Sequence, residues 1–265
     1  IYLVPSLGMP VPALTSGADL VAQSTHKLLG SLTQTSMLHG QGSRIDVDRI
    51  QRLQQILMST SPNYIFLASL DMARHQWVTE GQSLMKDTLN LARTLRRALN
   101  EIPGIACPGL EDIDGAFSLD ETKIIIDAKD LGLTAQELER ELRARHIEVE
   151  LMKAYHVLLL ITIGDTDTSI QQVIDAVQGI SDLYRHRIES STNSIDSYAS
   201  TVETLPTPIV ALSPRQAFYT EMEEIPLLQA LGRISGETIT YYPPGIPCLG
   251  VGETITEEVL AYMQQ

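Results

Sequence analysis

The first hundred residues alternate between short apolar runs and two stretches with helical periodicity. The run at 18–22 predicts a short buried strand that leads into a loop, and 33–38 predicts a second short strand. Apolar side chains then recur at three- and four-residue steps, which predicts a helix over about 46–58 and a longer helical region that reaches Asn100. A Pro-Gly pair follows and ends that helix.

Between residues 105 and 190 the pattern changes to strands separated by helices. Thr134 and Glu137 have the spacing of a capping box, and Ser169 opens a second helix with an apolar side. Strands are expected at 123–127, 147–151 and 157–163. The order strand–helix–strand–strand–helix predicts an α+β sandwich in which both helices cover one face of a small sheet.

The last third of the chain begins with a Ser/Thr-rich stretch at 185–206, whose composition is typical of a linker. Ser213 and Pro214 have the order of a helix cap followed by a proline at the first helical position. The Pro-rich segment 242–247 indicates a rigid turn.

Composition narrows the class of protein. The 265 residues are 43% hydrophobic and 20% charged, as in an ordinary globular chain of one large domain or two smaller ones. No apolar run reaches the ~18 residues of a membrane span, and the net charge of −14 disfavours nucleic acid and anionic membranes as partners. Two cysteines, Cys107 and Cys248, give no disulfide framework, so a cytoplasmic location is expected.

One lysine stands in a setting that suits covalent chemistry. Lys27 follows the first predicted strand and is preceded by Ser24, Thr25 and His26. A lysine that attacks a carbonyl needs a crowded, desolvated site that favours the neutral amine. Hydroxyls and a histidine beside it are groups that hold a phosphate. The spacing alone favours a solvated loop lysine and a satisfied core histidine over such a site.

The segment 22–36 resembles the pyridoxal-phosphate (PLP) attachment motif of the bacterial ornithine/lysine/arginine decarboxylases. That motif requires a small residue, Ser, His-Lys, two small residues, and a hydroxyl-Gln-small-small ending. Every constrained position fits. The matching residues are Ala22, Ser24, His26, Lys27, Gly30, Ser31, Thr33, Gln34, Thr35 and Ser36.

Other segments resemble the same family in the same order. A Ser-Pro turn leads into Leu-Ala-Ser-Leu-Asp within 61–71. The segments 213–218, 226–234 and 242–247 together resemble the C-terminal domain that is peculiar to these decarboxylases. The resemblance covers nearly the whole chain from about residue 10 onward.

The resemblance implies an α/β fold built from part of a fold-type-I PLP large domain. The expected domains are residues 1–100, the C-terminal part of the large domain with its linking helix; 101–190, a small α/β sandwich (α+β); and 191–265, the family's C-terminal domain. It also implies a homo-oligomer, at least a dimer, when the protein is complete.

The resemblance assigns roles to three residues. Lys27 would be the catalytic residue, which binds PLP as a Schiff base and also serves as a proton donor. His26 and Ser24 would contact the cofactor phosphate. The implied reaction is the decarboxylation of arginine, lysine or ornithine to an amine of the polyamine pathways.

Other acidic and histidine side chains are weaker candidates for a functional site. Glu148 and Glu150, placed on a strand, could face a cationic substrate, although an exposed sheet face explains them equally well. His39 and His156 have no partners at ligand spacing, so no metal site is expected. Asp19 precedes Lys27 and is expected to be structural.

The chain begins at Ile1, which predicts a fragment or a processed product. The family's upstream half, with the aspartate that pairs with the pyridine nitrogen, has no counterpart here, so poor PLP binding and no independent decarboxylation are expected. Two hypotheses follow. The chain is the C-terminal portion of a PLP-dependent decarboxylase, or it is a non-catalytic pseudoenzyme that acts as a binding or regulatory subunit of a full-length relative.

Overall fold

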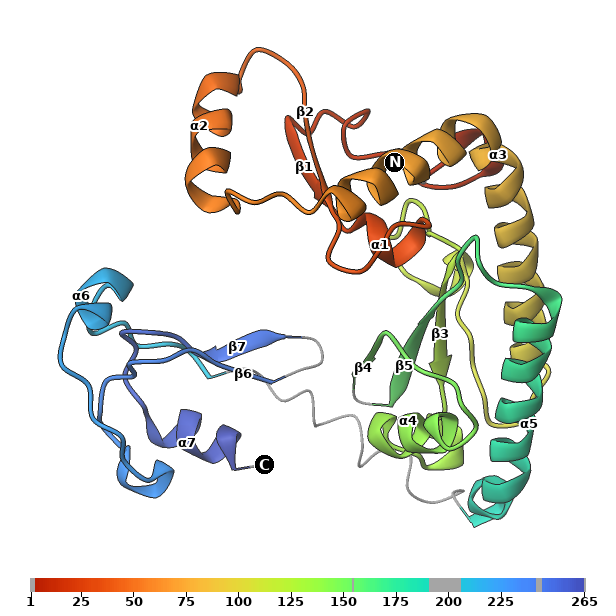
Figure 1. The fold of residues 1–265 in the computed structure, drawn as a ribbon. Coiled ribbons are helices and arrows are strands. Elements are labelled where there is room, and N and C mark those ends of the chain that lie inside the picture. The colour runs from red at the N-terminus through yellow and green to blue at the C-terminus, as the bar shows by residue number, and fades with distance from the viewer. Residues whose placement is uncertain (1–2, 154, 191–205, 242–244, 265) are drawn as a thin grey trace. The chain divides into compact units, whose positions relative to one another are not determined.

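The structure is a computed structural model that describes residues 3–153, 155–190, 206–241 and 245–264. The chain divides into two units (Figure 1). The first comprises Ile1–Glu150 and Tyr155–Ser190, and the second comprises Leu151–Ala154 and Ser191–Gln265. Within the described ranges, no helix combines the length and hydropathy needed to cross a bilayer.

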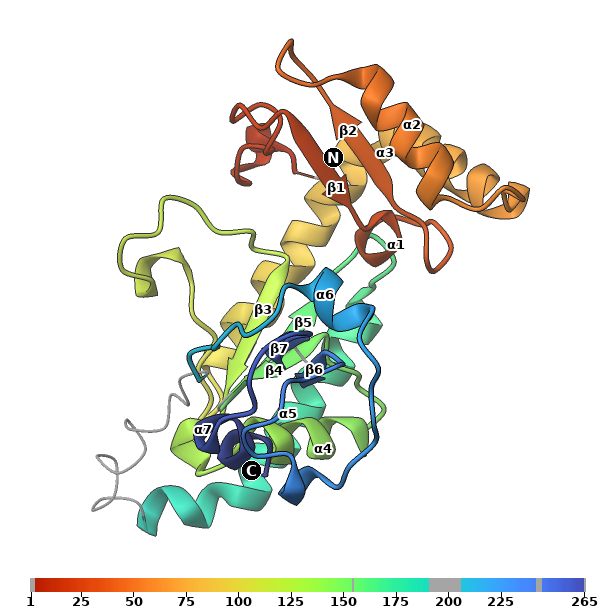
Figure 2. The same cartoon turned by 90° about the vertical axis from the view of Figure 1, so that its left-hand side faces the viewer.

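The lysine segment leaves a small two-stranded sheet. Strands β1 (Leu20–Gln23) and β2 (Met37–Gly40) pair antiparallel, with Gln23 opposite Met37 (Figure 2). The predicted burial of the first strand is wrong, because no residue of β1 is buried and no further described strand joins this sheet. The predicted second strand starts too early, since the chain turns back over 31–36 before β2 begins.

The predicted lysine loop is a short helix, α1 (Thr25–Leu28), with Ser24 at its N-cap. A helix of one turn was not visible in the sequence because it is too short to show apolar periodicity.

The two predicted helices of the first hundred residues are confirmed. Helix α2 (Val47–Leu57) begins where the Asp46 side chain accepts a hydrogen bond from the Arg49 N–H, and α3 (Tyr64–Asn100) begins where Asn63 caps two N–H groups. Cap bonds of this kind satisfy backbone donors that have no partner within the helix. The apolar side of α2 is exposed, so the apolar periodicity of this segment marks a face that no described residue covers.

Helix α3 supplies much of the core. Its buried residues are Ala73, Gly81, Met85, Thr88, Leu89, Ala92, Leu95 and Leu99. The face predicted for this helical region was Leu84, Thr88, Leu91, Leu95, Ala98 and Ile102. Thr88, Leu95 and Ile102 are buried, whereas the other three are half-buried, so the buried stripe overlaps the predicted one in part.

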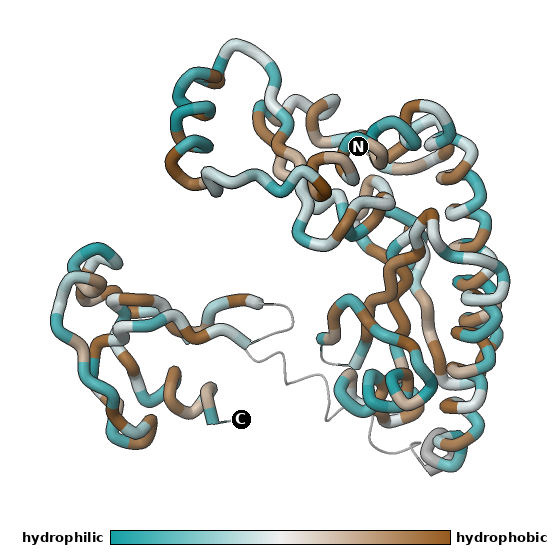
Figure 3. The backbone as a smooth tube through the Cα atoms, viewed as in Figure 1, coloured by the Kyte–Doolittle hydropathy of each residue, from teal (hydrophilic) through white to brown (hydrophobic). Residues whose placement is uncertain are grey.

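A three-stranded sheet packs against the helices, with strand order β3-β5-β4. Strands β3 (Lys123–Asp127) and β5 (His156–Leu160) pair antiparallel, with Ile124 opposite Leu159. Burial alternates along both strands, so one face of the sheet is packed. Figure 3 shows that both strands consist mainly of hydrophobic residues. Helix α4, the first of the two helices predicted to cover the sheet, contacts β5, and the long helix α3 contacts β3.

The predicted strand over 147–151 is wrong, because β4 covers Leu151–Lys153. His146 adopts a positive φ of 61° and the Ile147 N–H bonds the Leu142 carbonyl at 3.0 Å. This left-handed turn closes the preceding helix and delays the strand.

Helices α4 (Ala135–Arg143) and α5 (Asp167–Ser190) complete the first unit. The predicted capping box of α4 is present, with Thr134 and Glu137 bonding reciprocally. The predicted linker is wrong at 185–190, which belongs to α5, and its remainder at 191–205 lies outside the described residues. Short 3-10 helices occur at Pro5–Leu7, Leu110–Asp112, Lys129–Leu131 and Leu227–Gln229.

The second unit contains α6 (Pro214–Phe218), the antiparallel strands β6 (Ile239–Tyr241) and β7 (Ile246–Leu249), and α7 (Glu257–Met263). The predicted start of α6 is confirmed by a capping box between Ser213 and Gln216. The buried core cluster of the second unit consists of Ala230, Cys248, Leu249, Ile255 and Val259.

Candidate functional site

The site is built around the single turn of α1. Ser24 caps this turn, yet its exposed side chain makes no cap hydrogen bond. Thr25 is buried at 4% exposure, and its Oγ1 has no hydrogen-bond partner within the part of the chain that the structure describes. A buried hydroxyl without a partner is uncommon and calls for an explanation, such as a bound group.

The Lys27 amine forms an ion pair with the Glu150 carboxylate. The Lys27 side chain is 46% exposed and that of Glu150 is 28% exposed. The expectation of a crowded, desolvated lysine is therefore wrong for the described residues. The Lys27 side chain lies instead at an accessible surface, with its amine beside a carboxylate.

His26 is held by one backbone carbonyl. Its Nδ1 lies 2.7 Å from the Thr35 carbonyl oxygen, and its backbone N–H donates to the same oxygen at 3.4 Å. Because a carbonyl only accepts hydrogen bonds, Nδ1 must carry the proton. Nε2 is then an acceptor in the neutral ring, and it would donate a hydrogen bond to a phosphate only with both ring nitrogens protonated.

The segment that returns from α1 to β2 contributes residues that the sequence interpretation assigned no role. Thr35 is 3% exposed and supplies the carbonyl that holds His26. The preceding residue, Gln34, adopts a φ of 76°, in the left-handed region that favours glycine. No feature of the sequence indicates this backbone conformation at a glutamine.

The two glutamates proposed to face a cation have different surroundings. Glu148 is 71% exposed and lies 3.2 Å from Arg143, whereas Glu150 contacts Lys27. Both residues precede β4, so their predicted place on a strand is wrong. Only Glu150 is brought to the lysine turn.

Asp19 forms an ion pair with Arg44 at 2.7 Å. This contact agrees with the structural role expected for it. Over the described ranges, no group of three or more His, Cys, Asp or Glu side chains is placed to hold a metal ion.

Comparison with known proteins identifies the family. A family model described as Orn/Lys/Arg decarboxylase, major domain, matches residues 8–169, and one described as Orn/Lys/Arg decarboxylase, C-terminal domain, matches residues 196–265. The chain belongs to the Orn/Lys/Arg decarboxylase family. The resemblance based on the lysine segment is thereby confirmed.

Relatives of this decarboxylase-family chain from Bacillus species are named arginine decarboxylase. The protein from Bacillus anthracis is 42% identical over 260 residues, which cover 97% of this chain and 52% of the relative. The protein from Bacillus subtilis (strain 168) is 41% identical over 258 residues, which cover 96% and 51%. The chain spans about half the length of the curated relatives that it matches.

Solved structures of the family share the fold. The lysine decarboxylase LdcF of Francisella novicida matches with a TM-score of 0.71 and 25% identity, covering 92% of this chain and 44% of that one. Lysine decarboxylase A from Pseudomonas aeruginosa matches with a TM-score of 0.72 at 24% identity, over 92% and 44%, and supports the fold alone. The predicted α/β class is confirmed.

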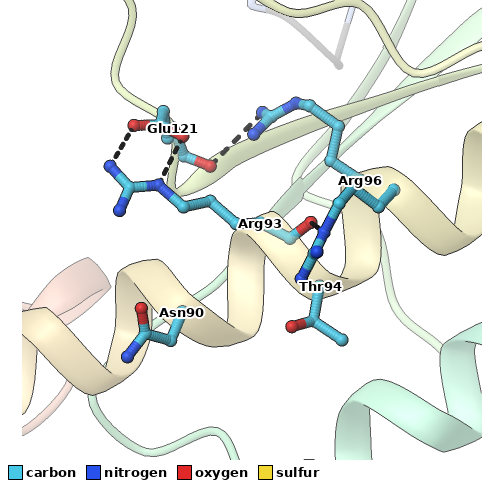
Figure 4. A pocket seen from close by; sticks show the side chains of 6 residues that line it. Asn90, Arg93, Thr94, Arg96 and Glu121 are labelled. Atoms are coloured by element: carbon cyan, nitrogen blue, oxygen red, sulfur yellow. Dashed lines mark hydrogen bonds and ion pairs between the residues drawn. The ribbon is translucent and has the colours of Figure 1, made fainter.

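A separate hollow of about 650 Å³ lies along α3 of this family member (Figure 4). Its lining residues are Asn90, Arg93, Thr94, Arg96, Arg97 and Glu121. Arg93 makes two hydrogen bonds to Glu121, which lower the pKa of that carboxyl, and Arg96 donates to the Glu121 and Lys123 carbonyls. These guanidinium groups fasten α3 to the start of β3.

Proposed function

We propose that this chain takes part in the PLP-dependent decarboxylation of a basic amino acid, with Lys27 as the residue that bonds the cofactor. The observation that carries the proposal is the placement of the Lys27 amine beside the Glu150 carboxylate on an accessible turn. Membership of the decarboxylase family supports the reaction class.

The groups around α1 fit a phosphorylated aldehyde. The Lys27 side chain is 46% exposed with its amine beside the Glu150 carboxylate, and Ser24 offers a hydroxyl without a cap bond. Thr25 adds a buried hydroxyl without a described partner. His26 would donate from Nε2 in its doubly protonated form, since Nδ1 is used by Thr35. Hydroxyl and imidazole donors of this kind suit a phosphate.

Glu150 gives the proposal a basis for substrate choice. When the Lys27 amine is engaged in a covalent bond, the carboxylate beside it is available to another cation. The side chains of arginine, lysine and ornithine all carry such a charge. Glu150 is favoured over Glu148 because Glu148 is more exposed and already paired with Arg143.

PLP, when bound, supplies the electron sink that accepts the electron pair released as the α-carboxylate leaves as carbon dioxide. The residues of this chain hold and orient the reactants and move protons. Lys27 is the proposed proton donor to the α-carbon, and Ser24 and His26 are the proposed phosphate ligands.

The complete protein is further proposed to be a homo-oligomer, at least a dimer. The apolar side of α2 supports this, since Ile56 and Leu57 are 76% and 81% exposed. Exposed apolar patches commonly mark interaction surfaces. Residues from elsewhere are expected to cover Lys27, which is why cofactor binding by this chain alone is expected to be weak.

The test is reductive trapping of the 265-residue chain with PLP and borohydride, followed by peptide mass spectrometry. A dominant adduct on Lys27, reduced in Ser24→Ala and His26→Ala and absent in Lys27→Ala, supports the proposal. Lys86, exposed on α3, is the reference lysine in the same sample. Equal labelling of Lys27 and Lys86 would contradict the assignment and favour a non-catalytic binding or regulatory subunit.

Substrate class is tested by adding an amino acid before reduction. Arginine, lysine and ornithine are expected to displace the Lys27 adduct more efficiently than citrulline, which has the length of arginine without its charge. Glu150→Gln is expected to remove this preference and Glu148→Gln to retain it. An unchanged preference in Glu150→Gln would rule out Glu150 as the recognition group.

A further inference from the structure

We propose that Thr35 and Ser69 are positioning residues that fix the ring of His26 through the segment between them. The connection runs from Ser69 on α3 to the Leu32 N–H, through the turn 32–35, and from the Thr35 carbonyl to His26. This proposal rests on the proposed function only in taking His26 as a phosphate ligand. The hydrogen bonds that orient the ring do not involve the cofactor.

Thr35 and His26 form the link of this connection that holds the imidazole ring. A single carbonyl oxygen accepts hydrogen bonds from both Nδ1 and the backbone N–H of His26. The ring therefore has a fixed relation to its own backbone. In the neutral ring the contact also selects the tautomer with the proton on Nδ1. Nε2 is left to face a ligand, as an acceptor in that tautomer and as a donor once it gains a second proton.

The second link is the rigid turn that carries this carbonyl. The Thr35 hydroxyl donates to the Leu32 carbonyl at 2.6 Å and lies 2.7 Å from Ser31 Oγ. The Thr35 N–H also reaches the Leu32 carbonyl, at 3.2 Å. With Thr35 buried and Gln34 in the left-handed region, the turn is held at both its backbone and its side chain.

The third link is the attachment of the turn to the long helix. Ser69 Oγ accepts a hydrogen bond from the Leu32 N–H at 3.3 Å and donates to the Phe66 carbonyl at 2.8 Å. One hydroxyl thus links the turn to the α3 backbone. The later turns of α3 are packed in the core, so this hydrogen bond anchors the turn 32–35 to a rigid helix.

The doubly protonated His26 ring would therefore donate to a phosphate through Nε2 alone, from a direction set by residues that do not touch the ligand. Loss of either hydroxyl should loosen the turn. A neutral histidine without its carbonyl acceptor then shifts toward a mixture of tautomers.

The test measures the His26 tautomer in the 265-residue chain without PLP, by long-range ¹H–¹⁵N NMR of the imidazole rings. The His26 signals are identified by their loss in His26→Gln. The wild-type ring is expected to carry its proton on Nδ1. Thr35→Val and Ser69→Ala are expected to add the Nε2-protonated form, and the conservative variants Thr35→Ser and Ser69→Thr to restore the wild-type pattern.

Matched substitutions on α3 separate positioning from general loss of stability. Thr88→Val removes another buried hydroxyl that bonds a backbone carbonyl, at 2.8 Å, and Ser83→Ala removes an exposed serine hydroxyl. Both are expected to leave the His26 tautomer unchanged. Circular dichroism establishes that each compared variant is folded.

An Nε2-protonated His26 in the wild-type chain would overturn the proposal, as would an unchanged tautomer in both Thr35→Val and Ser69→Ala. Trapping with PLP and borohydride gives an independent reading of the proposed function. If the tautomer shifts as expected while Lys27 is not labelled in any variant, positioning is supported and the cofactor proposal fails.

Discussion

The amine of Lys27 and the carboxylate of Glu150 form an ion pair although 123 positions separate them in the chain. Lys27 lies on the turn that follows β1, and Glu150 immediately precedes β4. A local sequence motif is thereby brought to a carboxylate from a distant segment. The pair joins the proposed cofactor lysine to the proposed recognition group for a cationic substrate.

Removing the carboxylate is expected to make the lysine more reactive. Exposed ion pairs contribute about 0.2–1 kcal/mol, so Glu150→Gln should raise the initial rate at which PLP labels Lys27 by up to about fivefold. The rate is measured by borohydride quenching and peptide mass spectrometry. Glu148→Gln is the matched control and should leave the rate unchanged. Slower labelling in Glu150→Gln would show that Glu150 assists cofactor attachment and does not restrain the amine.

The left-handed backbone of Gln34 predicts a distinct response to substitution. A β-branched side chain is strained at this φ, so Gln34→Val should lower the free energy of unfolding by about 1–2 kcal/mol. Gln34→Gly should leave it within about 1 kcal/mol or raise it. Urea denaturation gives both values. Gln51→Val, on the exposed side of α2, is the control and should cost about 0.5 kcal/mol through helix propensity. Equal losses in Gln34→Val and Gln51→Val would contradict the strain argument.

Features governed by neighbouring residues could be predicted from the sequence. The Thr134–Glu137 capping box is complete within four positions, and the end of α3 at Asn100 follows from the Pro-Gly pair beyond it. Membership of the family was equally visible, because the lysine motif is contiguous. Its residue types indicated the family before any structural comparison.

Features governed by distant contacts could not be predicted. The apolar run at β1 indicated burial, but burial depends on what covers the strand. The turn at His146 requires a positive φ, and a histidine in the sequence does not indicate that conformation. The approach of Glu150 to Lys27 is likewise a product of tertiary structure. The division into domains 1–100, 101–190 and 191–265 stays a prediction.

The buried cysteines should be poorly reactive. Cys107 is 1% exposed, and burial raises the pKa of its thiol to about 11. Because the thiolate is the nucleophile, iodoacetamide at pH 7.5 should modify Cys107 at least about a hundredfold more slowly in the native chain than in urea. Peptide mass spectrometry distinguishes it from Cys248, whose pKa burial also raises. Rapid native alkylation confined to Cys107 would show that the packing between α3 and β3 opens readily.

His39 on β2 predicts a specific dependence of stability on pH. Its Nε2 is buried without a partner among the described residues, and burial lowers the pKa of the ring from 6.5. The unfolded chain therefore binds a proton more readily than the folded one, so this contribution to stability is present above pH 6.5 and is lost as the pH falls through the lower folded value. Urea unfolding at pH 7.5 and pH 5 should show a larger acid-induced loss for wild type than for His39→Gln. His75→Gln, at an exposed position on α3, is the control and should behave as wild type. An equal acid-induced loss in His39→Gln and wild type would show that His39 stays solvated enough to accept its proton in the folded chain.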